Sequence, residues 1–256
     1  MPMKIFVRTA LNKVSLKQLL TPMLLLLAFP IVAQEATKAL TVQYAPGMVV
    51  QLIAPVTDPE KRHLRDLYFQ KNAETAQRHG YRQDGVLIVD ETLVGNFKPN
   101  VFVVSHWPSL KAQKTFQALP LFSGVKSLRR EAWEALKLYD HELDVPLEMT
   151  FTEDKSYTVA LAWTNPSNPS DYYEYMAALP PLVEKVGGRF MHQFNDVVVS
   201  AHNPDELAPQ QITFVEWDSK DGVEKLQALP EFAELAKKLQ SGTVRFELHR
   251  VTPRLQ

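Results

Sequence analysis

The chain has 256 residues, of which 45% are hydrophobic and 22% are charged, an ordinary balance for a folded soluble protein with a real core. It contains no cysteine, which excludes disulfides, thiol nucleophiles and cysteine-based metal sites. Its 28 basic and 29 acidic residues give a net charge of −1, and this balance does not favour nucleic acid as the main partner.

Residues 1–33 have the order of a secretory signal peptide. An apolar run over residues 23–29 precedes a small residue, Ala33, where cleavage is expected. The run is shorter than the roughly 20 residues of a membrane span, so an uncleaved anchor is only the alternative. We predict a periplasmic or secreted protein with no stable membrane insertion after cleavage. The start of the segment is basic and has no acidic residue: Lys4, Arg8, Lys13 and Lys17.

The rest of the chain contains an internal repeat. Residues 117–120 read Gln-Ala-Leu-Pro, and the same four residues recur at 227–230, 110 positions later. Trp107 and Trp217 keep this offset, and the segments that begin at Gly80 and Gly187 match at an offset of 107. An ordered series of matches at a nearly constant offset indicates two copies of one domain. The predicted copies span residues 48–143 and 157–251, with a linker over residues 144–156.

The first copy opens with an apolar strand over residues 48–54. Asp58 can cap a helix that has Pro59 in its first turn and that ends at Gly80. The elements that follow are strands over residues 86–89 and 101–107, a second helix broken at Pro120, and a last strand over residues 137–143.

The second copy repeats this order. Its first helix starts at Asn168 and Pro169, and the double proline at 180–181 predicts a bend or a restart of the helix. Strands are expected over residues 197–199, 212–217 and 244–251, with a helix broken at Pro230 between the last two. Each copy therefore reads β-α-β-β-α-β, which is the ferredoxin-like arrangement of an α+β fold. The strands are nearly all apolar, so we expect both faces of the sheet to be covered.

Several motifs of the second copy resemble those of a known family. They are Pro-Pro-Leu-Val at 180–183, Gly-Gly-Arg-Phe at 187–190 and Glu-Trp at 216–217. This pattern resembles the domain of unknown function 1330 family, in the dimeric α+β barrel superfamily. The resemblance covers most of residues 157–251. In the first copy it rests on Gly80, Arg82 and residues 107–109, and His106 stands where that family has Glu.

The resemblance implies a fold and leaves the function open. In that superfamily two ferredoxin-like units pair face to face, so that their sheets form one barrel. A chain with both units is expected to close the barrel within itself, as an intramolecular pseudo-dimer. The superfamily includes cofactor-independent monooxygenases, haem-binding enzymes, lactone isomerases and pure ligand-binding domains, so the fold does not choose among these functions.

The repeat itself suggests candidate site residues. His106 and Glu216 occupy equivalent positions on equivalent strands, and together they could act as a general base and an orienting acid. The alternative is that each lies at a strand end and meets solvent or a backbone amide. Arg82 and Arg189 are candidates for binding an acidic ligand, with ordinary salt bridges as the alternative; Arg189 has Glu216 as a possible partner.

Other candidates are weaker. Trp107, Trp217 and His192 are ligand-binding candidates, but packing is the simpler role for the two tryptophans. No metal site is predicted, because the seven histidines show no ligand spacing such as H-E-x-x-H, and we expect no cofactor. The basic group on the second helix of the first copy is expected to be a solvated helix face. That group consists of Lys126, Arg129 and Arg130, with Lys137 beyond the helix.

The predicted function is that of an exported protein that binds a small molecule between the two sheets. The alternative is a small-molecule enzyme of the cofactor-independent monooxygenase or isomerase type. A void between the sheets lined by His106 and Glu216 would favour the enzyme, whereas a barrel filled by large apolar side chains would favour a protein without catalysis.

Overall fold

The computed structural model describes residues 38–255, and the predicted signal peptide at residues 1–33 lies outside them. The described residues belong to one compact unit. The first copy contains β2 (Val49–Val56), the short 3-10 helix η1 (Pro59–Lys61), α1 (Arg62–Arg78), β3 (Arg82–Val94), β4 (Val101–Trp107), α2 (Leu110–Gln117), α3 (Pro120–Ala132) and β5 (Ala135–Glu142). The second contains β7 (Ser156–Thr164), α4 (Pro169–Lys185), β8 (Gly188–Asn195), β9 (Val198–Ala201), β10 (Gln211–Trp217), α5 (Gly222–Gln227), α6 (Pro230–Gly242) and β11 (Thr243–Pro253).

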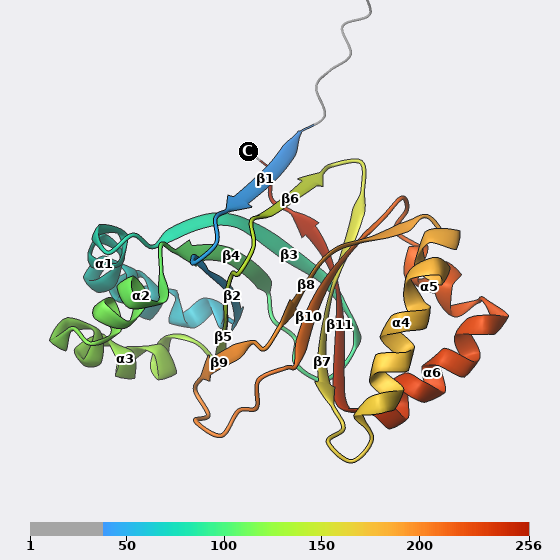
Figure 1. Cartoon of the computed structure of the whole chain (residues 1–256). Coiled ribbons are helices and arrows are strands. Elements are labelled where there is room, and N and C mark those ends of the chain that lie inside the picture. Colours follow the sequence, from blue (N-terminus) through green and yellow to red (C-terminus); the bar gives the residue numbers. More distant parts are fainter. Residues whose placement is uncertain (1–37, 256) are drawn as a thin grey trace, which may run out of the picture. The chain divides into compact units, whose positions relative to one another are not determined.

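Each copy builds the same four-stranded antiparallel sheet. The strand order is β5-β2-β4-β3 in the first copy and β11-β7-β10-β8 in the second, so equivalent strands take equivalent places. Helices α1 to α3 pack on the outer face of the first half and α4 to α6 on the outer face of the second (Figure 1). The predicted ferredoxin-like order is therefore confirmed in both copies.

The two halves join along two seams into one closed sheet. At the first seam β3 pairs antiparallel with β11, and at the second β5 pairs antiparallel with β9. Strand β9 follows β8 after only two residues, so the ends of the sheet meet (Figure 1). Because β3 and β11 are antiparallel, the two halves run in the same direction along the barrel. Equivalent residues of the two copies therefore lie at the same rim.

The inside of the barrel is packed with side chains from both copies. Fully buried aromatic residues include Phe102 from the first half and Trp163 and Phe214 from the second. A void of about 10 Å³ in this layer is lined by Leu52, Tyr139 and their neighbours, and it is about the space of one water molecule. Large side chains therefore occupy most of the inside of the barrel.

The segment predicted as a linker, residues 144–156, contains a strand. Strand β6 (Leu147–Thr152) pairs antiparallel with β1 (Ala39–Tyr44), and the two form a ribbon over one end of the barrel (Figure 1). Leu147, Met149 and Phe151 alternate along β6, and all three are buried in the barrel core. The linker prediction was wrong because this alternation has the period of a half-buried strand.

Two further expectations for the second copy were also wrong. Residues 197–199 do not form the second strand of its sheet; β8 does, and β9 is a separate strand that pairs with the other half. Asp196, with a φ of 54°, separates the two strands. Helix α4 runs through Pro180 and Pro181 without a restart, because the carbonyls that lose their donors belong to part-exposed Met176 and exposed Ala177, where water can replace them.

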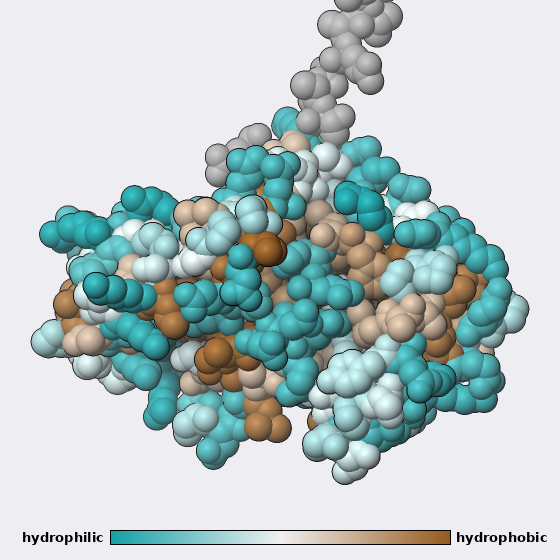
Figure 2. Space-filling model, viewed as in Figure 1, coloured by the Kyte–Doolittle hydropathy of each residue, from teal (hydrophilic) through white to brown (hydrophobic). Residues whose placement is uncertain are grey.

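The surface on the described residues is mixed. Figure 2 shows hydrophobic residues as separate spots among hydrophilic ones on the face in view. Within residues 38–255 no helix has the length and apolar character needed to cross a membrane.

Candidate functional site

His106 lies at the rim of the barrel beneath the β1–β6 ribbon. Its Nδ1 is 2.8 Å from Asp84 Oδ2, and the Tyr44 hydroxyl donates to the same oxygen at 3.0 Å. The imidazole also packs edge-on against the Tyr44 ring, with 5.4 Å between the ring centroids. Burial, and secondly the Asp84 carboxylate, raise the pKa of Tyr44 above its usual range. Position 106 is thus an imidazole oriented by a carboxylate from its own copy.

Glu216 occupies the equivalent place in the second half but has different partners. Arg189 Nη2 donates to Glu216 Oε2 at 3.1 Å, which is the ion pair that the sequence allowed. The structure does not bring His106 and Glu216 together: each is held within its own half, and neither lines the space between the helices and the sheet. Arg82 donates to the carbonyl of Gln77 in the last turn of helix α1 and to that of Tyr81.

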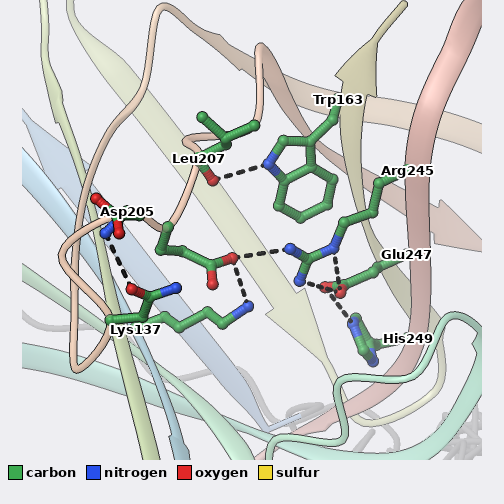
Figure 3. A network of polar contacts seen from close by, with 9 residues as sticks. Lys137, Trp163, Asp205, Leu207, Arg245, Glu247 and His249 are labelled. Carbon is green, nitrogen blue, oxygen red and sulfur yellow. Dashed lines mark hydrogen bonds and ion pairs between the residues drawn. The ribbon is translucent and has the colours of Figure 1, made fainter.

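The other end of the barrel is closed by a chain of paired charges (Figure 3). Glu206, on the loop between β9 and β10, accepts from Lys137 of the first half and from Arg245 of the second, both at 2.8 Å. Arg245 also donates to Glu247 at 2.6 Å, next to the buried His249. Burial raises the pKa of Glu247, but its contacts with His249 and Arg245 outweigh this effect and hold the pKa below its usual value. The network ties the two halves together at the second seam.

His192, another candidate from the sequence, also belongs to packing. Its ring lies 4.5 Å from that of Phe194, measured between centroids, and burial together with the neighbouring His141 lowers its pKa. No group of three or more potential metal ligands is found within residues 38–255.

The second half has a pocket between its helices and its sheet. The pocket holds about 240 Å³ and lies between α4, α5 and α6 on one side and β7, β8, β10 and β11 on the other. Aromatic and aliphatic side chains make most of its wall, and among them are Tyr172, Tyr175, Phe190, Trp217, Phe232 and Phe246.

Hydrogen bonds hold the polar groups of this wall in fixed positions. The indole N–H of Trp217 donates to Thr158 Oγ1 at 3.0 Å, and the hydroxyl of Tyr172 donates to Gln211 Oε1 at 2.7 Å. Gly222 gives the Trp217 ring its room, since a Cβ there would lie 2.5 Å from Cε3 of the indole. Burial alone raises the pKa of Tyr175 above its usual range, so its hydroxyl stays neutral. The pocket is preformed and apolar, and its wall, drawn from the described residues, has no charged side chain.

The equivalent place in the first half, under α1, has a smaller pocket of about 110 Å³. A larger and more polar cleft of the first half lies toward the second seam. It holds about 820 Å³ between α2, α3 and the strands β2, β5 and β9. Gln51 and Gln113 donate to the two oxygens of Asp140 at 2.7 and 2.9 Å. Burial raises the pKa of Asp140, and these two amides and Arg129 offset part of the rise. Trp107 lines this cleft, as Trp217 lines the pocket of the second half.

Known proteins agree with the fold. No protein-family model matches the chain, and no curated protein does. A solved structure described as an anthrone oxidase-like protein is 15% identical, covers 84% of this chain and 96% of its own, and has a TM-score of 0.51. The chain has a dimeric α+β barrel fold. A mutant chlorite dismutase from Candidatus Nitrospira defluvii is 10% identical, covering 82% of this chain and 93% of its own with a TM-score of 0.41.

This dimeric α+β barrel places its cavities outside the barrel, under the helices, where no sequence motif predicted them. Binding between the two sheets stays a prediction; large side chains, the polar Tyr139, Glu247 and His249 among them, occupy most of that space. A comparison of the two copies of the repeat could have pointed to these cavities from the sequence. Polar Gln51, Gln113 and Asp140 of the first copy correspond to Thr158, Val223 and Arg250 of the second, so the two copies differ at these three positions between their helices and their sheets.

Proposed function

We propose that this protein binds a small, mostly apolar molecule in the pocket between the helices and the sheet of its second half. The observation that carries the proposal is the preformed cavity of about 240 Å³ beside Trp217 and Tyr175. An apolar cavity of about 150 Å³ is enough to bind benzene, so this pocket suits a molecule of one or two rings. Thr158, Thr213 and Gln227 in its wall can orient a single polar group.

The direct test is a calorimetric titration with 1-naphthol, a two-ring molecule with one hydroxyl. We expect saturable binding of one molecule per chain. Ala236→Phe should weaken the affinity at least tenfold, because Ala236 lines the pocket and a phenyl ring there fills it.

Ala233→Phe is the matched control, since Ala233 is exposed on the same helix and does not line the pocket. It should bind like the parent protein. Equal binding by the parent and by Ala236→Phe would remove the pocket as the binding site.

A second candidate function is catalysis in the first half, and Asp140 is the observation that favours it. A carboxyl with a raised pKa, oriented by two amides and lining a large cleft, has the attributes of a general acid or base. The anthrone oxidase-like neighbour is compatible with an enzyme but shows only the fold. The reaction class that such a group supports is proton transfer at carbon next to a carbonyl.

This candidate is tested by hydrogen–deuterium exchange of 2-tetralone in D₂O, followed by NMR. We expect the protein to accelerate the exchange and Asp140→Asn to lose on the order of a hundredfold in rate. Asp66→Asn, on an exposed turn of α1, should leave the rate unchanged. No acceleration over buffer, or full activity in Asp140→Asn, rules the candidate out.

We also propose that the protein is exported and that it is related to one particular family of this fold. The basic and then apolar order of residues 1–33 supports cleavage near Ala33, and Gly187-Gly188-Arg189-Phe190 with Glu216 supports a relationship to the domain of unknown function 1330 family. Mass spectrometry of protein from the periplasm should show a start near Gln34. Intact Met1 on protein in the membrane fraction would contradict export with cleavage.

A further inference from the structure

A groove lined by positive charge lies where the two copies meet, between α3 of the first half and β9 of the second. It holds about 410 Å³. Lys126, Arg129 and Arg130 line it from α3, and Ser200 and His202 line it from the strand side. No acidic residue among residues 38–255 contributes to the wall.

The three cations of α3 have no carboxylate partner in the described part of the chain. Among the ion pairs of residues 38–255, which involve many of the other basic residues, none includes Lys126, Arg129 or Arg130. The sequence predicted a solvated helix face for this group, and Lys126 and Arg130 are indeed exposed. The structure also gathers the three charges along a groove, and the charge of Arg129 acts on Asp140 in the adjoining cleft without forming an ion pair with it.

Contacts with aromatic residues fix the Arg129 side chain in a position from which it can bind another group. Its Nε donates to the Tyr68 hydroxyl at 2.8 Å. Its guanidinium carbon lies 5.4 Å from the centroid of the Tyr68 ring and 5.0 Å from that of Phe122. These contacts fix the plane of the guanidinium and use only Nε. The two terminal nitrogens, which form the fork that binds carboxylate or phosphate, are left for another group.

His202 adds a polar atom without a partner. Its Nε2 is buried and makes no hydrogen bond among the described residues. Burial, followed by the charges of Arg130 and Arg129, lowers the pKa of this imidazole. A bound anion would offset both charges beside the ring and would accept a hydrogen bond from a ring nitrogen after a small rotation.

The fold does not require these charges. Helices α3 and α6 are equivalent and both have 13 residues. At the positions of Lys126, Arg129 and Arg130, helix α6 has Ala236, Leu239 and Gln240. The second half therefore packs the same helix against the same kind of sheet without positive charge at these three positions, and the exposed Lys126 and Arg130 serve something other than folding.

The groove is continuous with the cleft of the first half, whose wall has both aromatic rings and the carboxylates of Asp140, Glu142, Asp144 and Asp196. It shares Ser123, Lys126, Arg129, Leu138 and Ser200 with the 820 Å³ cleft of the first half. That cleft is also lined by Trp107, Phe116 and Phe122. A molecule lying across both would place a charged end among the cations and an uncharged body against the aromatic rings.

We propose that this groove binds the anionic group of a small amphipathic molecule, a carboxylate or a phosphate, whose apolar body lies in the adjoining cleft. Arg129 grips the anion through its terminal nitrogens, Lys126 and Arg130 supply the remaining charge, and Phe116 and Phe122 contact the body. The site is independent of the pocket in the second half, and it takes a different class of ligand.

The test is calorimetric titration with four probes: octanoate, octyl phosphate, octanol and inorganic phosphate. We expect octanoate or octyl phosphate to bind at least tenfold more tightly than octanol, which has the body without the charge, and than inorganic phosphate, which has the charge without the body. The better of the two eight-carbon anions identifies the headgroup. Binding should weaken as salt increases, because charged contacts near the surface are screened.

Variants of α3 test whether the anion binds in this groove. The double variant Lys126→Ala, Arg130→Gln introduces the residues of α6 and spares the packed Arg129, so folding is preserved, and it should weaken anion binding at least tenfold. Lys71→Ala on exposed α1 and Ala236→Phe in the other half should leave it unchanged. Equal affinity for octanoate and octanol, or unchanged binding in the double variant, would overturn the proposal.

Discussion

Asp84 organises the rim of the barrel at the level of single residues. One of its oxygens contacts both Tyr44 and His106, and the carboxylate and the imidazole are each about four-fifths buried, at 19% and 18% exposure. Such a shared acceptor fixes the ring orientation of His106. Glu216, at the same rim, instead holds the mostly exposed Arg189. The duplication has thus kept a polar residue at this place and changed its partner.

Double-mutant cycles should separate these two arrangements. We expect His106→Ala and Asp84→Ala to be coupled by about 0.5–3 kcal/mol in the free energy of unfolding, because they share one hydrogen-bonded network. His106→Ala and Glu216→Ala should be additive within about 0.5 kcal/mol, because no contact joins them. Urea titrations of the single and double variants give both terms. A coupling between His106 and Glu216 as large as that with Asp84 would mean that the two form one site after all.

Asp140 predicts a pH dependence of stability with a definite sign. Folding raises its pKa above the ordinary value of 3.8, so its contribution is fully present below that value and is lost as the pH rises through the higher folded pKa. Asp140→Asn has no such titration. The stability of the variant relative to the parent should therefore increase between about pH 4 and pH 7. Urea unfolding at both pH values measures it, and a relative stability that decreases with pH would show that the carboxylate is stabilised in the fold.

At the scale of elements, the β1–β6 ribbon is the part of the fold that the sequence analysis did not predict. The periodicity of β6 was readable, but its partner β1 lies more than 100 residues earlier, and hydrogen bonds such as Gln43 to Glu148 span 105 residues. By contrast, the glycines at the helix ends were predictable, because Gly80 and Gly187 have φ values of 93° and 78° that other residues avoid. Strand β4, at residues 101–107, was predicted to the residue from its apolar run.

The helix–sheet cavities were not predictable from either copy alone. A side chain such as Leu239 reads as an ordinary core position on an amphipathic helix, and only the packing of α6 against β11 and α4 leaves space beside it. Lys126 and Arg130 read as a solvated face because charge on a helix is usually solvated. A comparison of these residues with their counterparts in the other copy would have identified the pocket and the groove as regions where the copies differ.

The ribbon itself should contribute strongly to stability. Phe151 is fully buried, and its ring contacts Tyr157 and Phe214 at centroid distances of 5.0 and 6.4 Å. We expect Phe151→Ala to lower the free energy of unfolding by about 3–5 kcal/mol, as for other large core aromatics. Val145→Ala, at a position in the same segment that is 61% exposed, should cost under about 0.5 kcal/mol. Similar small losses in both, measured by urea unfolding, would show that the segment is a linker.

For the whole molecule, the closed sheet makes the two copies depend on each other. Each copy alone would expose one apolar face and the edges at both seams, β3 and β5 or β8–β9 and β11. A fragment of residues 157–256 should therefore dimerise or aggregate, because a bare apolar face of this size is not tolerated in a soluble monomer. Light scattering over a range of concentrations tests this. A stable monomeric fragment would mean that the copies fold as independent units.

The location of a bound apolar ligand is the most direct test of the proposed function. Methyl NMR of the protein, titrated with 1-naphthol, reports on the barrel interior and on the helix–sheet pocket at the same time. We predict that the methyl groups of Leu179, Val183, Val215, Leu226 and Leu239 shift, whereas those of the barrel core, such as Leu52, Val159 and Leu161, stay in place. Shifts confined to the barrel core, or no saturable shifts at all, would contradict the proposed function.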